Sequence, residues 1–183
     1  MLNAKDSAEV MVNGYSHNNV TFRCADRKDV SLILHFIKKL AAYEKVPEAV
    51  HATEELLEEW MFEKNRAEAI FAMVDGTEVG FVFFYQTFPA YLGKGGIYID
   101  DLYIDPEYRG RGIGKKLISH MAKVALERKC ARIEWCCLNW NESSMEFYRS
   151  LGAVALDECT IFRAPESVLT LLAEGEFCKT LLT

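Results

Sequence analysis

The sequence predicts a single α/β domain built on a mixed sheet, and three observations support this fold class. Apolar patterns typical of strands alternate with patterns typical of helices along most of the 183 residues. Half of the residues are hydrophobic and 26% are charged, which is the composition of an ordinary folded domain. The dipeptide Asp75-Gly76 separates two apolar runs and predicts a β-hairpin. The length is sufficient for one domain with a proper core.

The first half of the chain predicts three strands and two helices. Asp26 and Thr53 are the expected helix N-caps, because their side-chain oxygens can accept the first free backbone N–H groups. The aromatic residues of the second apolar run around the hairpin are expected in the core of the sheet: Phe81, Phe83, Phe84 and Tyr85. The expected elements are strands over 20–25, 69–74 and 78–85, and helices over 26–44 and 53–61.

The second half continues the alternation of strands and helices. Asn141 is the expected N-cap of a short helix that Gly152 ends. The expected elements are strands over 97–105, 131–138 and 158–163, and helices over 112–129, 141–151 and from Pro165 onward. Residues 1–19 are polar and are expected to form a flexible N-terminal extension, so that residues 20–183 form the domain.

Charge and cysteine content limit the possible partners. A net charge of −6 argues against a nucleic-acid partner and favours a cationic substrate. No apolar run approaches the roughly 20 residues that cross a bilayer, and residues 1–19 do not resemble a secretory signal, so no membrane association is expected. The six cysteines form no C-x-x-C pair, which favours reduced thiols in the cytoplasm and argues against a metal site.

A glycine-rich segment, Arg109-Gly-Arg-Gly-Ile-Gly114, lies between an apolar strand and a helix. Its spacing fits neither a Walker P-loop nor the G-x-G-x-x-G dinucleotide motif. A strand, a glycine loop and a helix start in this order direct backbone N–H groups at an anion. The segment therefore predicts a site for a phosphorylated ligand, with a helix start that serves packing alone as the alternative.

Two adjacent acids, Asp100 and Asp101, interrupt the apolar strand before this loop. Adjacent strand residues point to opposite faces unless a bulge intervenes. A carboxylate here could take a proton from an ammonium or hold a second ammonium. The alternative is a structural role, with each carboxylate bonded to neighbouring backbone or arginine groups.

Several motifs together resemble the GNAT N-acetyltransferases. The segment 98–104 followed by 109–114 is similar to the acetyl-CoA motif of that family, and 139–148 followed by Leu151-Gly152-Ala153 is similar to its next motif. Leu40-Ala-Ala-Tyr43-Glu44 and Tyr91-Leu-Gly93-Lys94 resemble the spermidine/spermine, diamine and thialysine N-acetyltransferases. The resemblance implies a GNAT fold, with a mostly antiparallel mixed sheet, a splayed strand pair and flanking helices.

The resemblance also implies where acetyl-CoA, the co-substrate, would bind. The pyrophosphate would lie on the glycine loop, and the pantetheine arm would pair with the edge of strand residues Leu102 to Ile104, where that strand splays from residues 133–138. A backbone N–H near Leu102 would polarise the thioester carbonyl. The implied residues are Leu102, Tyr103, Ile104, Arg109, Gly110, Arg111, Gly112, Ile113, Gly114, Lys115, Asn141 and Ser144, with no metal.

On the acceptor side, the resemblance implies a small polyamine, diamine or lysine-like amine that attacks the thioester directly. Tyr148 matches the tyrosine that protonates the leaving thiolate, and Asp100 occupies a position that is usually glutamate in this subgroup. Tyr43, Glu44 and Glu158 would bind the substrate. Cys159 replaces a tryptophan that is frequent in bacterial relatives, so the shape of the pocket is expected to differ. A cytoplasmic homodimer is expected.

Two other functions remain open from the sequence. The same fold could acetylate proteins or peptides, although the predicted acids favour a small polycation. A non-catalytic domain that binds acyl-CoA is the second alternative, and the presence of Tyr148 argues against it.

Overall fold

The computed structural model describes residues 19–175, so the predicted N-terminal extension lies outside the described residues except for Asn19. The chain divides into two compact units, of which the first ends at Leu138 and the second begins at Asn139. Each unit is described by itself below.

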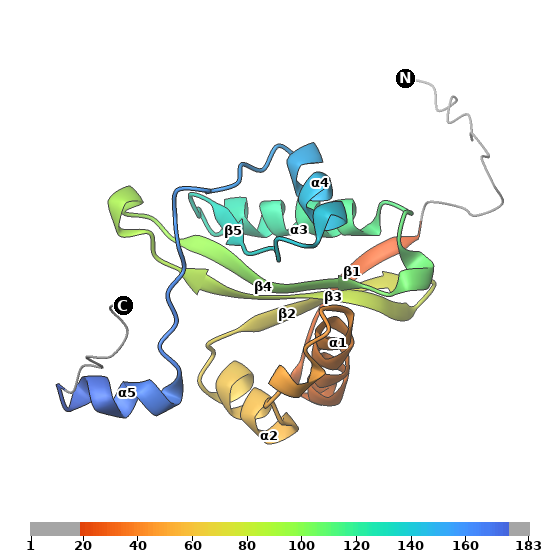
Figure 1. Cartoon of the computed structure of the whole chain (residues 1–183). Helices are drawn as coiled ribbons and strands as arrows, with labels where there is room; N and C mark the ends of the chain where they lie inside the picture. Colours follow the sequence, from red (N-terminus) through yellow and green to blue (C-terminus); the bar gives the residue numbers. More distant parts are fainter. Residues whose placement is uncertain (1–18, 176–183) are drawn as a thin grey trace, which may run out of the picture. The chain divides into compact units, whose positions relative to one another are not determined.

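The first unit contains the sheet, and its elements alternate as the sequence predicts (Figure 1). The helix that begins after Thr53 continues beyond Leu57 as a π-helical segment to Glu63. The elements are β1 (Val20–Cys24), α1 (Val30–Tyr43), α2 (Glu54–Leu57), β2 (Glu68–Val74), β3 (Thr77–Thr87), β4 (Gly96–Ile104), α3 (Ile113–Glu127) and β5 (Ile133–Trp135).

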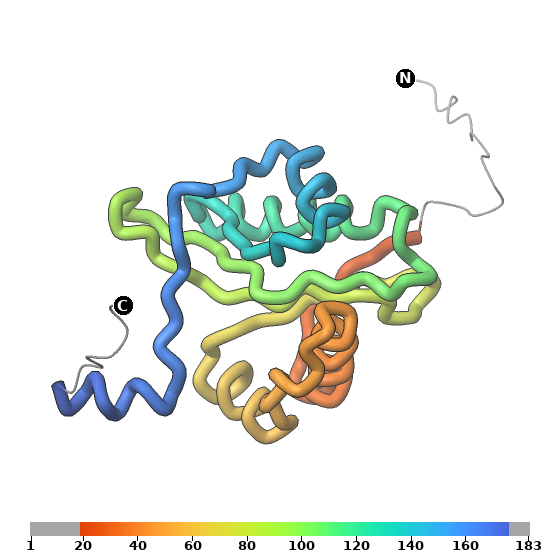
Figure 2. Tube along the Cα trace, viewed as in Figure 1, coloured from red at the N-terminus to blue at the C-terminus, as the bar shows by residue number. Residues whose placement is uncertain are grey.

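The five strands lie side by side in the order β1-β2-β3-β4-β5, which can be followed along the chain in Figure 2. The first four pair antiparallel, and β4 pairs with β5 in parallel. This parallel ladder joins only Ile97–Ile99 to Ile133–Trp135. The strand predicted over 131–138 is therefore shorter than expected. Its partner β4 has an irregularity in its pairing immediately after Ile99, and the parallel ladder ends at that residue.

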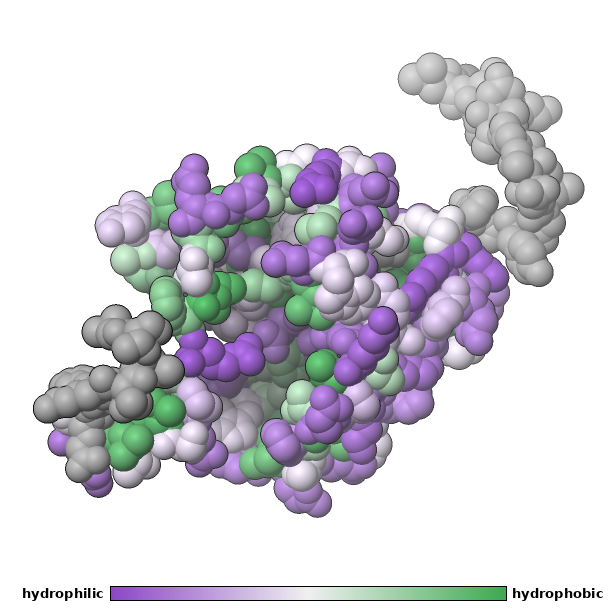
Figure 3. All heavy atoms as spheres, in the orientation of Figure 1, coloured by the Kyte–Doolittle hydropathy of each residue, from purple (hydrophilic) through white to green (hydrophobic). Residues whose placement is uncertain are grey.

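Helices cover both faces of the sheet, with α3 on one face and α1 and α2 on the other (Figure 1). The α3 face buries an apolar cluster that includes Val82, Ile97, Ile99, Leu117 and Met121. The α1 face buries a second cluster that includes Ile33, Phe36, Phe71, Phe81 and Tyr103. On the face of the chain that Figure 3 shows, hydrophilic and apolar side chains are intermixed.

The predicted caps are present. The Asp26 carboxylate accepts the Lys28 N–H, and Asp29 accepts the Asp26 N–H at 2.7 Å, which completes a capping box. Thr53 accepts the Leu56 N–H at the start of α2. Local sequence therefore sets where these helices begin.

The second unit contains α4 (Glu142–Ser150) and α5 (Glu166–Ala173). Asn141 caps α4 as predicted, since its side-chain oxygen accepts the Ser144 N–H at 3.2 Å. The strand predicted over 158–163 is wrong, because no described residue pairs with this segment and the Ile161 and Phe162 side chains are exposed. Strand propensity without a neighbouring strand does not produce a strand.

Candidate active site

The glycine loop enters α3 through two left-handed residues. Gly110 and Gly112 have φ angles of 71° and 75°, a region that side chains with a Cβ rarely adopt. No heavy atom lies within 4 Å of the place that a Cβ would take at either glycine, so the loop is open on that side. The first intrahelical hydrogen bond runs from Lys116 N–H to Gly112 C=O, which leaves the preceding N–H groups outside the helical ladder. This geometry suits an anion such as a pyrophosphate.

The two arginines of the loop lie over different aromatic rings. The Arg109 guanidinium lies 4.5 Å from the centre of the Tyr43 ring, and its Nε donates to the Ile104 carbonyl at 2.8 Å. The Arg111 guanidinium lies 5.1 Å from the Tyr108 ring. Arg109 therefore links the loop to the end of α1. Within residues 109–114, it is the backbone N–H groups that are arranged to bind an anion.

The edge of β4 at residues 102–104, which is expected to hold a pantetheine arm, has backbone groups that do not pair with β5. Leu102 and Ile104 pack toward α3, whereas Tyr103 is buried on the α1 face. Pairing between β4 and β5 ends at Ile99, so this edge of residues 102–104 extends past the end of β5. That arrangement agrees with the predicted splayed pair.

A β-bulge interrupts β4 at Asp100. Ile99 lies opposite Phe84 and Asp101 opposite Phe83, so Asp100 is an extra residue with no residue opposite it on β3. Before the bulge, Tyr98 alternates with Ile99, which is buried on the α3 face. After the bulge, Asp101 shares the face of Tyr103, which is buried on the α1 side. Alternation on either side of the bulge thus places both carboxylates on the α1 face. Adjacent strand residues otherwise point to opposite faces, so the bulge is what puts Asp100 and Asp101 on the same one.

Glu44, at the end of α1, completes a group with these two residues that we call the acid cluster: Glu44, Asp100 and Asp101. Burial raises the pKa of Asp101 to about 7, and the negative charges of Asp100 and Glu44 contribute in the same direction. Burial also raises the pKa of Glu44. No ion pair within the described residues includes Asp101. The sequence singles out Asp101 together with Asp100 but assigns a site role to Asp100 alone, because the sequence does not show that a bulge places both on one face.

Cys137 faces this cluster from the segment after β5. Burial raises the pKa of its thiol, and the negative charge of Glu44 raises it further. A neutral thiol beside the cluster adds no charge that would neutralise the carboxylates.

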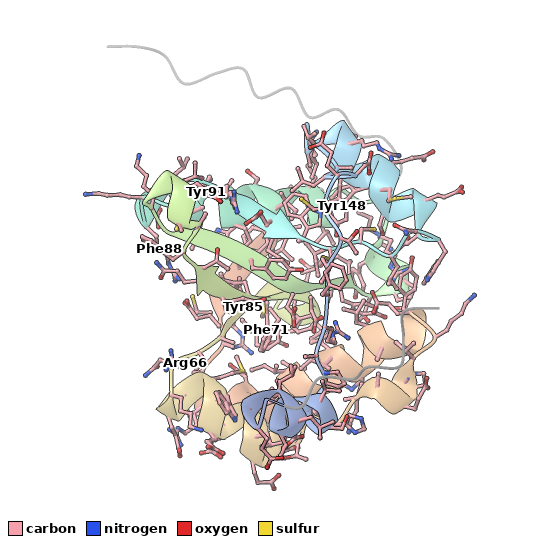
Figure 4. All side chains as sticks on the ribbon, turned by 60° about the vertical axis from the view of Figure 1, so that its left-hand side comes forward. Arg66, Phe71, Tyr85, Phe88, Tyr91 and Tyr148 are labelled. Atoms are coloured by element: carbon pink, nitrogen blue, oxygen red, sulfur yellow. The ribbon has the colours of Figure 1, made fainter. Side chains whose placement is uncertain are left out.

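A pair of stacked tyrosines lies next to Asp100. Tyr85 on β3 is directly opposite Tyr98 on β4, and their ring centres are 5.3 Å apart. Burial raises the pKa of both phenols, and the charge of Asp100 contributes to each shift. Tyr98 Oη donates to Cys136 Sγ at 2.9 Å. Tyr85 lies on the same side of the sheet as Phe71 (Figure 4).

The sheet aromatics divide into two groups. Phe81 and Phe84 are buried, as expected for core residues. Phe83 and Tyr85 are only half-buried, and the expectation that Tyr85 is a core residue is wrong. Tyr85 follows the last buried residue of β3, where α1 no longer covers the face, so its ring lies against Tyr98 instead of against a helix.

The remaining candidates belong to the second unit. Asn141 is 8% exposed and caps α4. Ser144 lies in the first turn of α4, and Tyr148 lies in its last turns with its ring 5.2 Å from that of Phe147. Glu158 is exposed in a turn instead of on the expected strand.

Two features are absent from the described residues. They contain no group of three or more His, Cys, Asp or Glu side chains arranged to hold a metal ion. Among residues 19–175, no helix has both the length and the apolar composition that a membrane span requires.

The family follows from comparison with known proteins. A profile of the acetyltransferase (GNAT) family matches residues 34–153, which include the glycine loop, the acid cluster and Tyr148. The chain belongs to the GNAT family. GNAT enzymes use acetyl-CoA as co-substrate, and the open glycine loop at the start of α3 is consistent with that ligand.

Relatives with assigned activities act on amines. The thialysine N-epsilon-acetyltransferase of Bos taurus is 36% identical over 148 residues, which cover 76% of this chain and 86% of the relative. The human spermidine/spermine N(1)-acetyltransferase-like protein 1 is 30% identical over 142 residues, covering 73% of this chain and 20% of that protein.

Among solved structures, an integron cassette protein from V. cholerae superposes with a TM-score of 0.72 at 27% identity, covering 85% of this chain and 98% of that one. A metagenomic aminoglycoside acetyltransferase in complex with sisomicin gives 0.70 at 21% identity, covering 81% and 97%, and supports the fold alone. The chain therefore has the GNAT fold and is an acetyltransferase that uses an amine acceptor.

Proposed function

We propose that this protein transfers the acetyl group of acetyl-CoA to a primary amine of a small polyamine, diamine or lysine-like acceptor. The observation that carries this choice of acceptor is the acid cluster. Three carboxylates on one face, of which Asp101 has no partner in an ion pair among the described residues, favour a ligand with positive charge. The names of the relatives, thialysine and spermidine/spermine acetyltransferases, support the same class.

The glycine loop would hold acetyl-CoA, which supplies an activated acetyl thioester. Backbone N–H groups of Gly110–Lys115 and the start of α3 bind the pyrophosphate. The exposed edge of Leu102–Ile104 pairs with the pantetheine arm, and a backbone N–H near Leu102 polarises the thioester carbonyl. Asn141 and Ser144 contact the same arm.

The chemical step needs one base and one acid. An alkylammonium has a pKa near ~10, so it must lose a proton before its nitrogen can attack. The acid cluster, with Asp100 as the sequence proposes, takes that proton directly or through water. The nitrogen then forms a bond to the acetyl carbon, the C–S bond breaks, and the Tyr148 hydroxyl donates its proton to the thiolate. The nitrogen loses its second proton as the amide forms, and that proton restores the Tyr148 hydroxyl. Both substrates are bound at once, and no acyl-enzyme forms.

Tyr43, Glu44 and Glu158 complete the acceptor side of this proposal. The Tyr43 ring lies beneath the Arg109 guanidinium, which fixes the end of α1 next to the loop. Glu44 belongs to the acid cluster and would bind an ammonium. We further propose that residues 20–183 act as one domain, in a cytoplasmic homodimer.

A screen of acceptors tests the proposal. Acetyl transfer is measured with spermidine, spermine, putrescine, thialysine, lysine and a set of short peptides, by following release of free CoA. We expect the small polycations to have the highest kcat/KM. Preference for peptides would favour a protein acetyltransferase, and tight acetyl-CoA binding without transfer to any amine would favour a binding domain.

A further inference from the structure

Two contacts hold the end of α1 to the segment that leads from β4 into the glycine loop. One turn before the helix ends, Lys39 Nζ lies 2.7 Å from Oδ1 of the buried Asp105. In the last turn, the Tyr43 ring lies beneath the Arg109 guanidinium, with 4.5 Å between the guanidinium carbon and the ring centre. Lys39 and Tyr43 are four residues apart, so both contacts are made by one face of the helix.

The Arg109 side chain is directed at β4 and α1. Its Nε donates to the Ile104 carbonyl at 2.8 Å, and its guanidinium also lies 5.3 Å from the centre of the Tyr103 ring. No ion pair within residues 19–175 includes Arg109. The backbone N–H groups of the loop are therefore the groups arranged for an anion, and this side chain serves another purpose.

The end of α1 depends on support from outside the helix. Lys45 follows Glu44 with a φ of 64°, at the position after a helix where glycine is usual. The next N–H, that of Val46, donates to the Ala41 carbonyl at 2.9 Å and closes a Schellman turn. A side chain with a Cβ is strained in this left-handed region. The position of Glu44 is consequently less strongly fixed by its own helix end than it would be beside a glycine.

We propose that Arg109 is a positioning residue that couples the two substrate sites, because it transmits the ordering of the glycine loop by acetyl-CoA to Tyr43 and Glu44. The inference rests on the proposed function, which assigns acetyl-CoA to the loop and an ammonium to Glu44. An anion held by the loop's N–H groups restricts the backbone next to Arg109, and the guanidinium then restricts the Tyr43 ring. Such coupling through restricted motion needs no change of arrangement, and it acts equally in both directions.

Hydrogen exchange of the full chain, with and without acetyl-CoA, tests this coupling in the absence of an acceptor. In the wild type, acetyl-CoA should slow exchange about fivefold or more both at residues 109–116 and at residues 40–46. In Arg109→Gln the slowing at 109–116 should remain and that at 40–46 should be lost. Arg109→Lys keeps a cation over the ring and should recover part of the response. Lys123→Gln, which replaces an exposed cation of α3, is the control and should respond as the wild type does.

Steady-state kinetics with spermidine separate a positioning role from a phosphate contact. Arg109→Gln should raise the KM for spermidine about tenfold and change the Kd for acetyl-CoA, measured without an acceptor, less than about threefold. Arg111→Gln removes the same charge from the same loop, but its guanidinium lies over Tyr108, so it should weaken acetyl-CoA binding without the larger effect on KM. Tyr43→Leu combined with Arg109→Gln should be no worse than the more severe single variant, because both remove one contact.

The contrary outcomes distinguish the inference from the proposed function. A wild type in which acetyl-CoA slows exchange at 109–116 and not at 40–46 would overturn the inference alone. So would an Arg109→Gln variant that keeps the slowing at 40–46, or one whose main defect is a higher Kd for acetyl-CoA. Additive effects of the two substitutions would exclude the Tyr43 ring as the route. A wild type that binds acetyl-CoA and acetylates no amine would overturn the proposed function, whatever the exchange data show.

Discussion

Replacing Asp101 by asparagine should stabilise the protein, and the gain should depend on pH. The pKa of this carboxyl rises from 3.8 to about 7 on folding, a difference of roughly 3 units. At about 1.4 kcal/mol per unit, the cost of ionising Asp101 in the folded state is ~4 kcal/mol at most. The side chain keeps partial solvent contact, which lowers this value.

The sign follows from proton binding. Between pH 3.8 and about 7 the folded state binds more protons at Asp101 than the unfolded state, so the free energy of unfolding falls as pH rises through this window. Asparagine is neutral at every pH and has the same shape. The variant should therefore match the wild type near pH 4 and exceed its stability by ~2–4 kcal/mol above pH 8, equivalent to a rise in Tm of roughly 10 °C.

Urea denaturation of both proteins across this pH range measures the difference directly. Glu127→Gln serves as the control, because that acid is exposed and its replacement should give the same small difference at every pH. A difference between Asp101→Asn and wild type that stays constant from pH 4 to pH 8.5 would refute the claim that this half-buried carboxylate is ionised at a cost in the folded state. The test does not depend on any acceptor.

Three further substitutions have defined outcomes. Tyr148→Phe removes the proposed acid and should lower kcat by about 10²-fold or more with little change in the Kd for acetyl-CoA, and unchanged turnover would exclude the role. Gly112→Ala forces a side chain into a φ of 75° and should cost ~1–2 kcal/mol of stability in urea and weaken acetyl-CoA binding in calorimetry; wild-type values for both would contradict the account of the loop. Gly80→Ala would place a Cβ 2.5 Å from the Tyr103 carbonyl oxygen and should cost ~1–3 kcal/mol, whereas a neutral effect would show that β3 and β4 can separate there.

Local signals predicted the parts of this fold that depend on local physics. Asp26 and Asn141 cap their helices as expected, since a cap needs only its own side chain and the next few N–H groups. The turn at Asp75-Gly76 joins β2 to β3 for the same reason. The strand predicted over 158–163 is wrong because a strand also needs a partner, which its own residues do not specify.

The candidate site shows the same limit. The glycine loop could be located from the spacing of Gly110, Gly112 and Gly114, because backbone geometry at a helix start is a local property. The grouping of Asp101 with Asp100 could not, because it depends on a bulge set by the register between β3 and β4. Likewise, Arg109 lies over Tyr43 because the loop and the end of α1 are brought together by the fold, although more than sixty residues separate them.

The central claim, direct transfer of acetyl from acetyl-CoA to a small polyamine, diamine or lysine-like amine, is tested most directly by mass spectrometry of one reaction. The protein is first mixed with acetyl-CoA alone, then with putrescine, and the intact protein, free CoA and the amine are measured. The account predicts an unchanged protein mass throughout, and monoacetylputrescine formed in equal amount to the CoA released. An acetylated protein after the first step, or CoA release without acetylated amine after the second, would contradict it.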